Sequence, residues 1–158
     1  MCWLCDNPGA SRRDYIRHLS RIVERNGWAV QGVERGRVQP PWAYTIGLTR
    51  HGLPELVVTG MRPTKAAELL NDVAEHCLHA APPKPGEVVP MVGGPTFEVV
   101  KVAQPAGRMI VATEILNTKF TALQLVHADY RGTWPWETGY RGVQPVLGAR
   151  AYPPASAA

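Results

Sequence analysis

The chain has 158 residues, of which 45% are apolar and 19% are charged. This composition allows one hydrophobic core, and it has too little charge for a disordered chain. No apolar run approaches the roughly 18 residues of a membrane helix, so we expect no membrane insertion. The net charge of +4 weakly favours phosphate-bearing partners.

Residues 1–10 open with a Cys-x-x-Cys pair, Cys2 and Cys5. They lack the basic start and the apolar run of a signal peptide. Three cysteines are too few for a disulfide framework, so we expect a reducing, cytoplasmic location. The turn sequence Asn7-Pro8-Gly9 indicates that this segment is a non-helical entry.

A first helix is expected to begin near Arg12 and to end at Asn26-Gly27. Ser11 and Asp14 have the spacing of a capping box, and a glycine suits the position after a helix. Five apolar residues recur at helical spacing and define one buried face: Tyr15, Ile16, Leu19, Ile22 and Val23.

The remaining chain predicts strands around a second helix. That helix should run from about Thr64 to His79, because its apolar residues again form one face. Segments rich in β-branched and aromatic residues predict strands at residues 28–33, 42–48, 56–59, 87–92, 96–102, 108–115 and 121–128. We therefore predict an α+β fold, a single domain over residues 11–150 whose mixed or antiparallel sheet packs against two main helices. A flexible tail should follow at 151–158.

Four strings in this order carry a family resemblance: residues 26–33 (NGWAVQGV), 41–48 (PWAYTIGL), 52–56 (GLPEL), and 128–136 (AD through GTWPW). Together they resemble a bacterial family known only as domain of unknown function 4262. The Cys-x-x-Cys opening is similar to an actinobacterial-type subset of its members. The resemblance implies a small cytosolic bacterial domain and brings no established reaction, cofactor or catalytic residue.

The cysteine pair is the sharpest local motif. Two thiolates at this spacing can bind one tetrahedral Zn²⁺ if two further ligands are near. Cys2 and Cys5 are the first two ligands, and the candidates for the others are His18, His51, His76, Cys77, His79 and His127. We favour His76 and His79, because they lie three residues apart on the second predicted helix and could share a face. A redox dithiol and a pair of idle thiols stay open as alternatives.

Arginines recur every four residues on the first predicted helix, at Arg13, Arg17, Arg21 and Arg25. Between residues 12 and 37 there are seven arginines against three acids. Such a row can follow a phosphate backbone, which makes RNA or the ribosome a candidate partner. The alternative is an ordinary solvated helix face.

A third candidate site is a ligand pocket made of Trp42, Tyr44, His51, Glu55 and Asp129. A histidine and two carboxylates could perform acid–base chemistry if they converged. The two aromatic residues could equally be strand core. No nucleophile elbow, phosphate-binding glycine loop or zinc-protease helix is present.

The aromatic segment Trp134-Pro135-Trp136 should either close the edge of the core or contact a protein partner. Exposed, these rings and Trp3 would offer stacking surfaces for bases.

Our leading hypothesis is a non-enzymatic, zinc-binding accessory or regulatory domain that associates with an RNA-rich assembly such as the ribosome. The alternative is a small-molecule-binding domain or enzyme that uses His51, Glu55 and Asp129.

Overall fold

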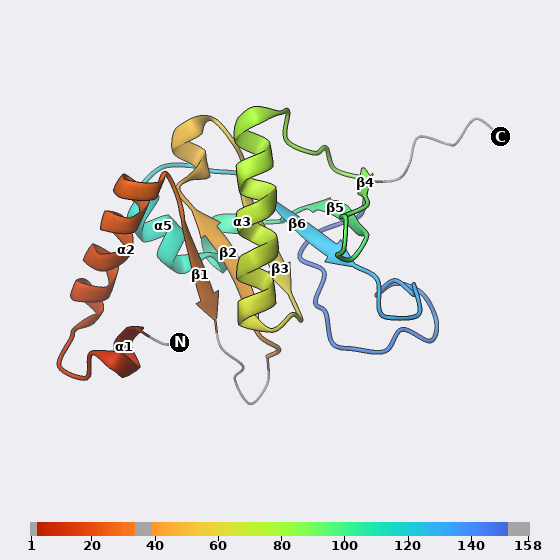
Figure 1. The fold of residues 1–158 in the computed structure, drawn as a ribbon, viewed down its shortest axis with the longest axis horizontal. Coiled ribbons are helices and arrows are strands. Elements are labelled where there is room, and N and C mark those ends of the chain that lie inside the picture. The colour runs from red at the N-terminus through yellow and green to blue at the C-terminus, as the bar shows by residue number, and fades with distance from the viewer. Residues whose placement is uncertain (1–2, 34–38, 152–158) are drawn as a thin grey trace.

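A computed structural model describes residues 3–33 and 39–151. Six strands form one mixed sheet in the order β1-β2-β3-β6-β5-β4 (Figure 1). The strands are β1 (Ala29–Val33), β2 (Trp42–Ile46), β3 (Glu55–Thr59), β4 (Val88–Val89), β5 (Phe97–Lys101) and β6 (Ala122–His127). Two antiparallel halves, β1-β2-β3 and β6-β5-β4, are joined by the parallel pair β3 and β6. This confirms the predicted α+β class with a mixed sheet.

Helices cover both faces of the sheet. They are α1 (Trp3–Asp6), α2 (Arg12–Asn26), the 3-10 helix η1 (Leu48–His51), α3 (Pro63–His79), α4 (Pro105–Arg108) and α5 (Ile110–Leu116). The long helix α3 crosses one face, where it contacts β1, β2 and β3 (Figure 1). The apolar residues of α2 and α5 share a second core with the opposite face. The sheet is therefore the middle of three layers.

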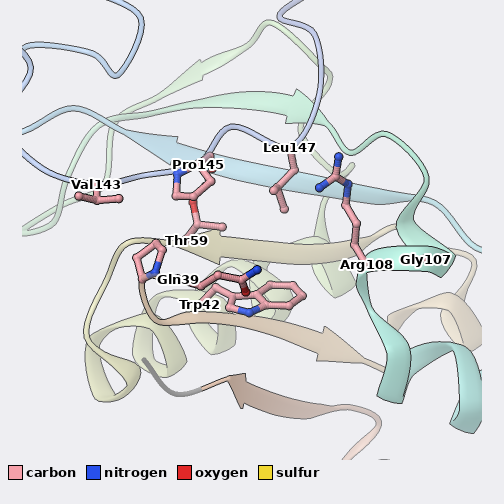
Figure 2. A pocket seen from close by; sticks show the side chains of 9 residues that line it. Gln39, Trp42, Thr59, Gly107, Arg108, Val143, Pro145 and Leu147 are labelled. Atoms are coloured by element: carbon pink, nitrogen blue, oxygen red, sulfur yellow. The ribbon is translucent and has the colours of Figure 1, made fainter. Parts of the chain in front are cut away.

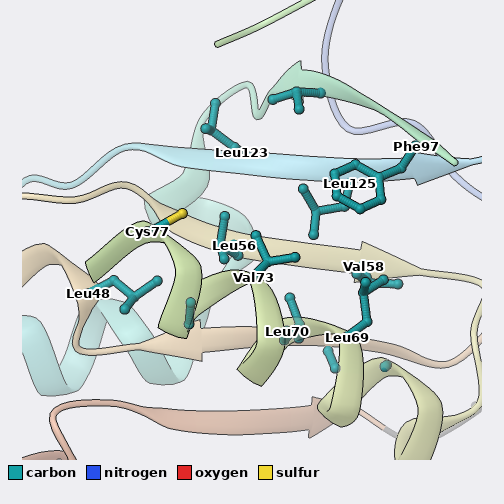
Figure 3. Packing of buried hydrophobic residues seen from close by; sticks show 14 residues of the cluster. Leu48, Leu56, Val58, Leu69, Leu70, Val73, Cys77, Phe97, Leu123 and Leu125 are labelled. Carbon is teal, nitrogen blue, oxygen red and sulfur yellow. The ribbon is translucent and has the colours of Figure 1, made fainter. Parts of the chain in front are cut away.

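The core under α3 follows from the predicted apolar face of that helix. Leu70, Val73 and Cys77 lie on it and pack toward Leu56 and Leu125 of the two central strands (Figure 3). Cys77 is 4% exposed, and burial raises the pKa of its thiol. A buried thiol in an apolar layer acts as a small apolar side chain.

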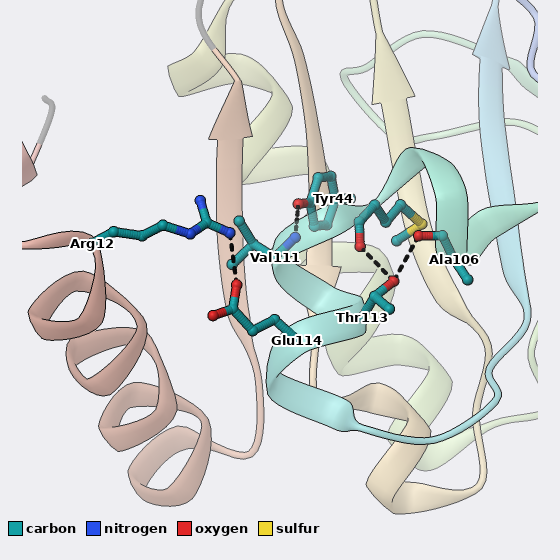
Figure 4. Close-up of polar contacts among 7 residues, drawn as sticks. Arg12, Tyr44, Ala106, Val111, Thr113 and Glu114 are labelled. Carbon is teal, nitrogen blue, oxygen red and sulfur yellow. Dashed lines mark hydrogen bonds and ion pairs between the residues drawn. The ribbon is translucent and has the colours of Figure 1, made fainter.

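On the opposite face, Tyr44 anchors α5 to the sheet. Its hydroxyl accepts a hydrogen bond from the backbone N–H of Val111 at 3.3 Å (Figure 4). Burial raises the pKa of Tyr44 to about 12, so the phenol stays protonated at neutral pH. An ion pair of 2.6 Å between Arg12 and Glu114 links the start of α2 to α5. Tyr44 is thus part of the strand core, which was the alternative to its place in a ligand pocket.

The predicted start of α2 is confirmed in detail. The Ser11 hydroxyl accepts a hydrogen bond from the N–H of Asp14 at 3.2 Å, and the Asp14 carboxylate accepts one from the N–H of Ser11 at 2.8 Å. These hydrogen bonds from Ser11 lower the pKa of Asp14. The helix ends at Gly27, whose φ is 92° and whose N–H donates to the carbonyl of Val23.

The predicted strand at residues 108–115 is wrong, because α4 and α5 occupy this segment. Its β-branched residues suggested a strand. The buried positions are instead Met109 and Ala112, three residues apart, while Ile110 between them is 54% exposed. That is a helical period, and in this segment periodicity outweighs residue propensity.

The N-terminal entry was predicted to be non-helical, and this is also wrong, because Trp3–Asp6 form one helical turn. The side-chain amide of Asn7 donates to the carbonyl of Trp3 at 2.8 Å, and the Trp3 ring stacks on His18 at a centroid distance of 4.7 Å. A cap and a ring contact thus stabilise a turn too short to be stable alone.

Smaller differences affect the strands near the sheet edge. The segment at 87–92 pairs over Val88–Val89 alone. The predicted tail lies almost wholly outside the described residues, which end at Ala151. Among the described residues, no helix has the length and apolar character to cross a membrane.

Gly47, between β2 and η1, predicts a stability effect that depends on its missing side chain. Its φ is 124°, and an added Cβ would lie 2.7 Å from the Gly27 carbonyl oxygen and 2.9 Å from a methyl group of Val23. We expect Gly47→Ala to lower the free energy of unfolding by about 2 kcal/mol or more in urea titrations. The control Gly9→Ala, where an added Cβ meets no atom within 4 Å, should change it by less than about 0.5 kcal/mol. Equal effects of the two substitutions would contradict this account.

Candidate functional site

The arginine row of α2, defined as Arg13, Arg17, Arg21 and Arg25, is exposed along its whole length. At 100° per residue the row turns by about 40° with each step, and it lies largely away from the side of the buried residues Leu19 and Val23. Arg17 makes an ion pair with Asp14 at 3.9 Å, and both side chains are about half exposed. Within the described part of the chain, the other three arginines make no ion pair.

The structure adds two basic residues that the sequence did not associate with this row. The His51 ring lies 3.2 Å from the carbonyl oxygen of Gly27, which follows α2 directly. Arg50 and His51 form the basic last turn of η1 and are exposed. Arg50 and His51 are distant from α2 in the sequence, so the sequence does not show that they lie near its end. The close approach of Gly47 to Gly27 brings them there.

Helix α1, which contains Cys5, contacts the middle of α2 through the side chain of Trp3. Trp3, two residues before Cys5, stacks on His18 with an interplanar angle of 16°. Cys5 is exposed. Its predicted partner Cys2 lies outside the described residues.

The two predicted histidine ligands lie elsewhere. His76 and His79 belong to the last turn of α3, which ends at the top of Figure 1, whereas α1 lies at the bottom. His79 contacts Glu75 at 3.2 Å. The structure therefore does not bring Cys5 together with this pair. Among residues 3–33 and 39–151, no three His, Cys, Asp or Glu side chains form a group that could hold a metal ion.

Glu55 is fully buried at the start of β3, and its carboxylate is saturated with hydrogen bonds. One oxygen accepts from the Thr45 hydroxyl at 2.6 Å. The other accepts from the N–H of Gly47 at 3.0 Å and from the N–H and hydroxyl of Thr49 at 3.0 and 2.7 Å. A buried carboxylate held by four donors fixes the β2–η1 turn and has no oxygen turned toward solvent.

The other two members of the predicted acid–base group lie apart from Glu55 and from each other. His51 is exposed beside Gly27. Asp129 follows the far end of β6, and because β3 and β6 are parallel with Glu55 opposite Ala122, roughly 17 Å of strand separates the two ends. The structure does not bring the histidine and the two carboxylates into one cleft.

Asp129 organises the loop after β6. Its carboxylate accepts hydrogen bonds from the N–H groups of Arg131, Thr133 and Arg141 at 2.9, 2.9 and 3.0 Å. Burial raises the pKa of Asp129, but the three N–H groups together lower it below its usual value. Asp129 is therefore a turn-forming acid, and its carboxylate is occupied by the backbone of its own loop.

The tryptophans of the same loop form a stacked pair at the molecular edge. The rings of Trp134 and Trp136 are 5.4 Å apart and nearly parallel. The Arg150 guanidinium lies 3.8 Å from the Trp136 ring and pairs in two contacts of 2.8 Å with the buried Glu98. Half-buried and engaged in this way, the rings close the edge of the fold and are not open platforms for bases.

A pocket of about 480 Å³ opens on the other side of the sheet from α3 (Figure 2). Its floor is formed by Trp42 and Thr59 of neighbouring strands, and Arg108 of α4 stands at one end. Residues 143–148, here called the C-terminal strap, supply the remaining wall with Pro145 and Leu147. Of the predicted pocket residues, Trp42 is the one that lines it.

Comparison with known families identifies the chain at the level of a family. Residues 22–141 match the family Domain of unknown function (DUF4262), and the chain therefore belongs to that family. No curated protein and no solved structure gives a significant match. Cys5, most of the arginine row and the strap lie outside the matched residues.

The Glu55 network predicts a large stability loss from an almost isosteric change. Glu55→Gln would replace charge-assisted hydrogen bonds by neutral ones and place an amide N–H₂ against the Thr45 hydroxyl, which now donates to the carboxylate. We therefore expect the free energy of unfolding to fall by about 2–4 kcal/mol in urea titrations. Glu68→Gln, at an exposed site on α3, is the matched control and should change it by less than about 0.5 kcal/mol. A neutral result for Glu55→Gln would show that the buried carboxylate is not needed.

Proposed function

We propose that this member of the DUF4262 family is a non-enzymatic cytoplasmic binding domain whose arginine row associates with an RNA-rich assembly such as the ribosome. One observation carries the proposal: the row is exposed over its whole length on the side of α2 away from the core. Guanidinium groups bind phosphate in two parallel hydrogen bonds, and exposed ones need little desolvation to do so.

The geometry of the row favours contact with a chain of phosphates. Twelve residues of helix separate Arg13 from Arg25, which corresponds to about 18 Å. Arg50 and His51 continue the basic surface beyond the end of the helix. Phosphate contacts of this kind carry no sequence information, so the association should be sequence-independent and sensitive to salt.

Binding without catalysis is supported by the positions of the ionisable side chains. The carboxylate oxygens of Glu55 accept hydrogen bonds from backbone and hydroxyl donors, and those of Asp129 accept them from three N–H groups. His51 has neither carboxylate as a hydrogen-bond partner. General acid–base work needs such groups within reach of one substrate atom.

The proposal predicts a steep salt dependence of RNA binding. With about 0.7 of a counterion released per phosphate contact, four contacts give a slope of log affinity against log salt near −3. We expect this slope for a single-stranded 20-mer RNA measured by fluorescence anisotropy between 50 and 200 mM salt. The same protein should pellet with ribosomes at low salt and leave them at high salt.

The control for this experiment separates the row from net charge. Changing all four arginines of the row to Gln should lower the affinity at least tenfold and reduce the slope by about 0.7 for each arginine. A quadruple variant with the same charge loss at exposed sites elsewhere, Arg62→Gln, Lys65→Gln, Lys84→Gln and Lys119→Gln, should keep the wild-type slope. A flat salt response of the wild type, or an equal loss in both variants, would sink the proposal.

A second candidate function, zinc binding at the N-terminus, is favoured by the contact between α1 and His18. The imidazole of His18 stacks on the ring of Trp3, and Trp3 belongs to the same helical turn as Cys5. We propose His18 as a ligand in place of His76 and His79, together with Cys5 and Cys2. Zinc held there would fasten α1 to α2 at the start of the arginine row, which is a structural or a regulatory role.

Metal analysis of untagged protein tests this candidate. We expect about one zinc per chain, lost on changing Cys2 and Cys5 to Ser and reduced by His18→Gln. The variant His76→Gln with His79→Gln should keep its zinc, because those residues lie at the distant end of α3. Wild-type protein free of zinc after preparation without chelators would remove the candidate.

A further inference from the structure

We propose that the pocket between the C-terminal strap, β2, β3 and α4 binds a small aromatic anion, that is, a flat ring system carrying one carboxylate. The proposal does not rest on RNA association, because the pocket and the arginine row are made of different residues. It also differs from the predicted acid–base pocket, with which it shares Trp42 alone.

The apolar part of the pocket has the form of a slot suited to a ring. The Trp42 indole is half-buried and is backed by the buried ring of Tyr44 at a centroid distance of 5.1 Å. Leu147 and Pro145 of the strap lie opposite the indole (Figure 2). Aromatic faces and aliphatic side chains on two sides favour a planar ligand.

The charged part of the pocket consists of one arginine. Arg108 donates its Nε–H to the carbonyl of Ala103 at 2.8 Å, which orients the guanidinium. Among the described residues, its Nη atoms make no hydrogen bond or ion pair, and no Asp or Glu lines the pocket. A guanidinium already held by one bond can present two parallel donors to a carboxylate. The pocket should therefore prefer an anion to a neutral or cationic ligand.

The strap that closes the slot is fixed by three short hydrogen bonds. Thr59 and Gln124 both donate to the carbonyl of Pro145 at 2.7 Å, and Gln124 accepts from the N–H of Leu147 at 2.7 Å. These buried polar side chains are thereby satisfied, which leaves Arg108 and the Gln39 amide of the lining as donors for a ligand. A preformed wall lowers the entropy cost of binding.

The size of the pocket selects the ligand class. A volume of about 480 Å³ lies within the usual range of roughly 300–1,000 Å³ for small-molecule sites. It accommodates a bicyclic aromatic acid, and it is too small for a dinucleotide cofactor. We therefore choose 2-naphthoate as the probe and its neutral amide, 2-naphthamide, as the matched control ligand.

The experiment follows the Trp42 indole N–H resonance in the full chain during titration with each ligand. The resonance is assigned by its loss in Trp42→Phe. We expect 2-naphthoate to shift it in a saturable manner and to bind at least tenfold more tightly than 2-naphthamide. Arg108→Gln should remove this preference, and Arg108→Lys should keep part of it. The control Arg62→Gln, at an exposed arginine that does not line the pocket, should keep all of it.

A second variant keeps the test decisive if Arg108→Gln disturbs α4. Val143 is 67% exposed at the pocket rim, so Val143→Glu should fold, and its carboxylate should weaken 2-naphthoate binding without weakening that of 2-naphthamide. Equal affinity of the two ligands for the wild type overturns the proposal. So does saturation that leaves the Trp42 resonance unmoved.

Discussion

The buried carboxylate of Glu55 is the constraint on which much of the architecture depends. Glu55 stands at the start of β3 and accepts hydrogen bonds from Thr45 in β2, from Gly47 in the turn and from Thr49 in η1, and so joins these segments. The turn held in this way places Gly47 against Gly27, and thereby sets where α2 ends relative to the sheet. The contact between Gly47 and Gly27 therefore also fixes the position of the exposed side of α2. A residue that resembles a catalytic acid in the sequence is thus a structural one.

The two proposed binding surfaces are built on different physical principles. The arginine row is an exposed helix face, so contacts there are weak individually and depend on number and on ionic strength. The pocket is concave and contains one guanidinium beside apolar walls, so a single ion pair there is better shielded from water. One surface is suited to a long polyanion and the other to a small anion.

Periodicity predicted the two long helices, α2 and α3, because one buried face leaves a regular pattern in the sequence, and residue propensity predicted most strands. Both ends of α2 and the face of α3 were correct for this reason. The segment at 108–115 was misassigned because β-branched residues were given more weight than the spacing of Met109 and Ala112. The turn at Trp3–Asp6 was missed because contacts with His18 and Asn7 stabilise it.

The candidate sites divide in the same way. The arginine row could be derived from the sequence, because all its members lie on one helix. The pocket could not, because its lining comes from segments near residues 40, 59, 108 and 145 that only the tertiary fold assembles. The burial of Glu55 and the separation of His51 from Asp129 likewise follow from the sheet order, which local patterns do not encode.

The parallel pairing of β3 with β6 has a consequence for how the chain is made. Every other neighbouring pair in the sheet is antiparallel. The strands of these pairs are close in sequence, apart from β5 and β6, which α4 and α5 separate. During synthesis, β3 is made before its partner β6, and one of its edges stays unpaired in the meantime. The sheet can be completed only after residues 122–127 have been made, and until then the unpaired edge of β3 is a site where the nascent chain can aggregate.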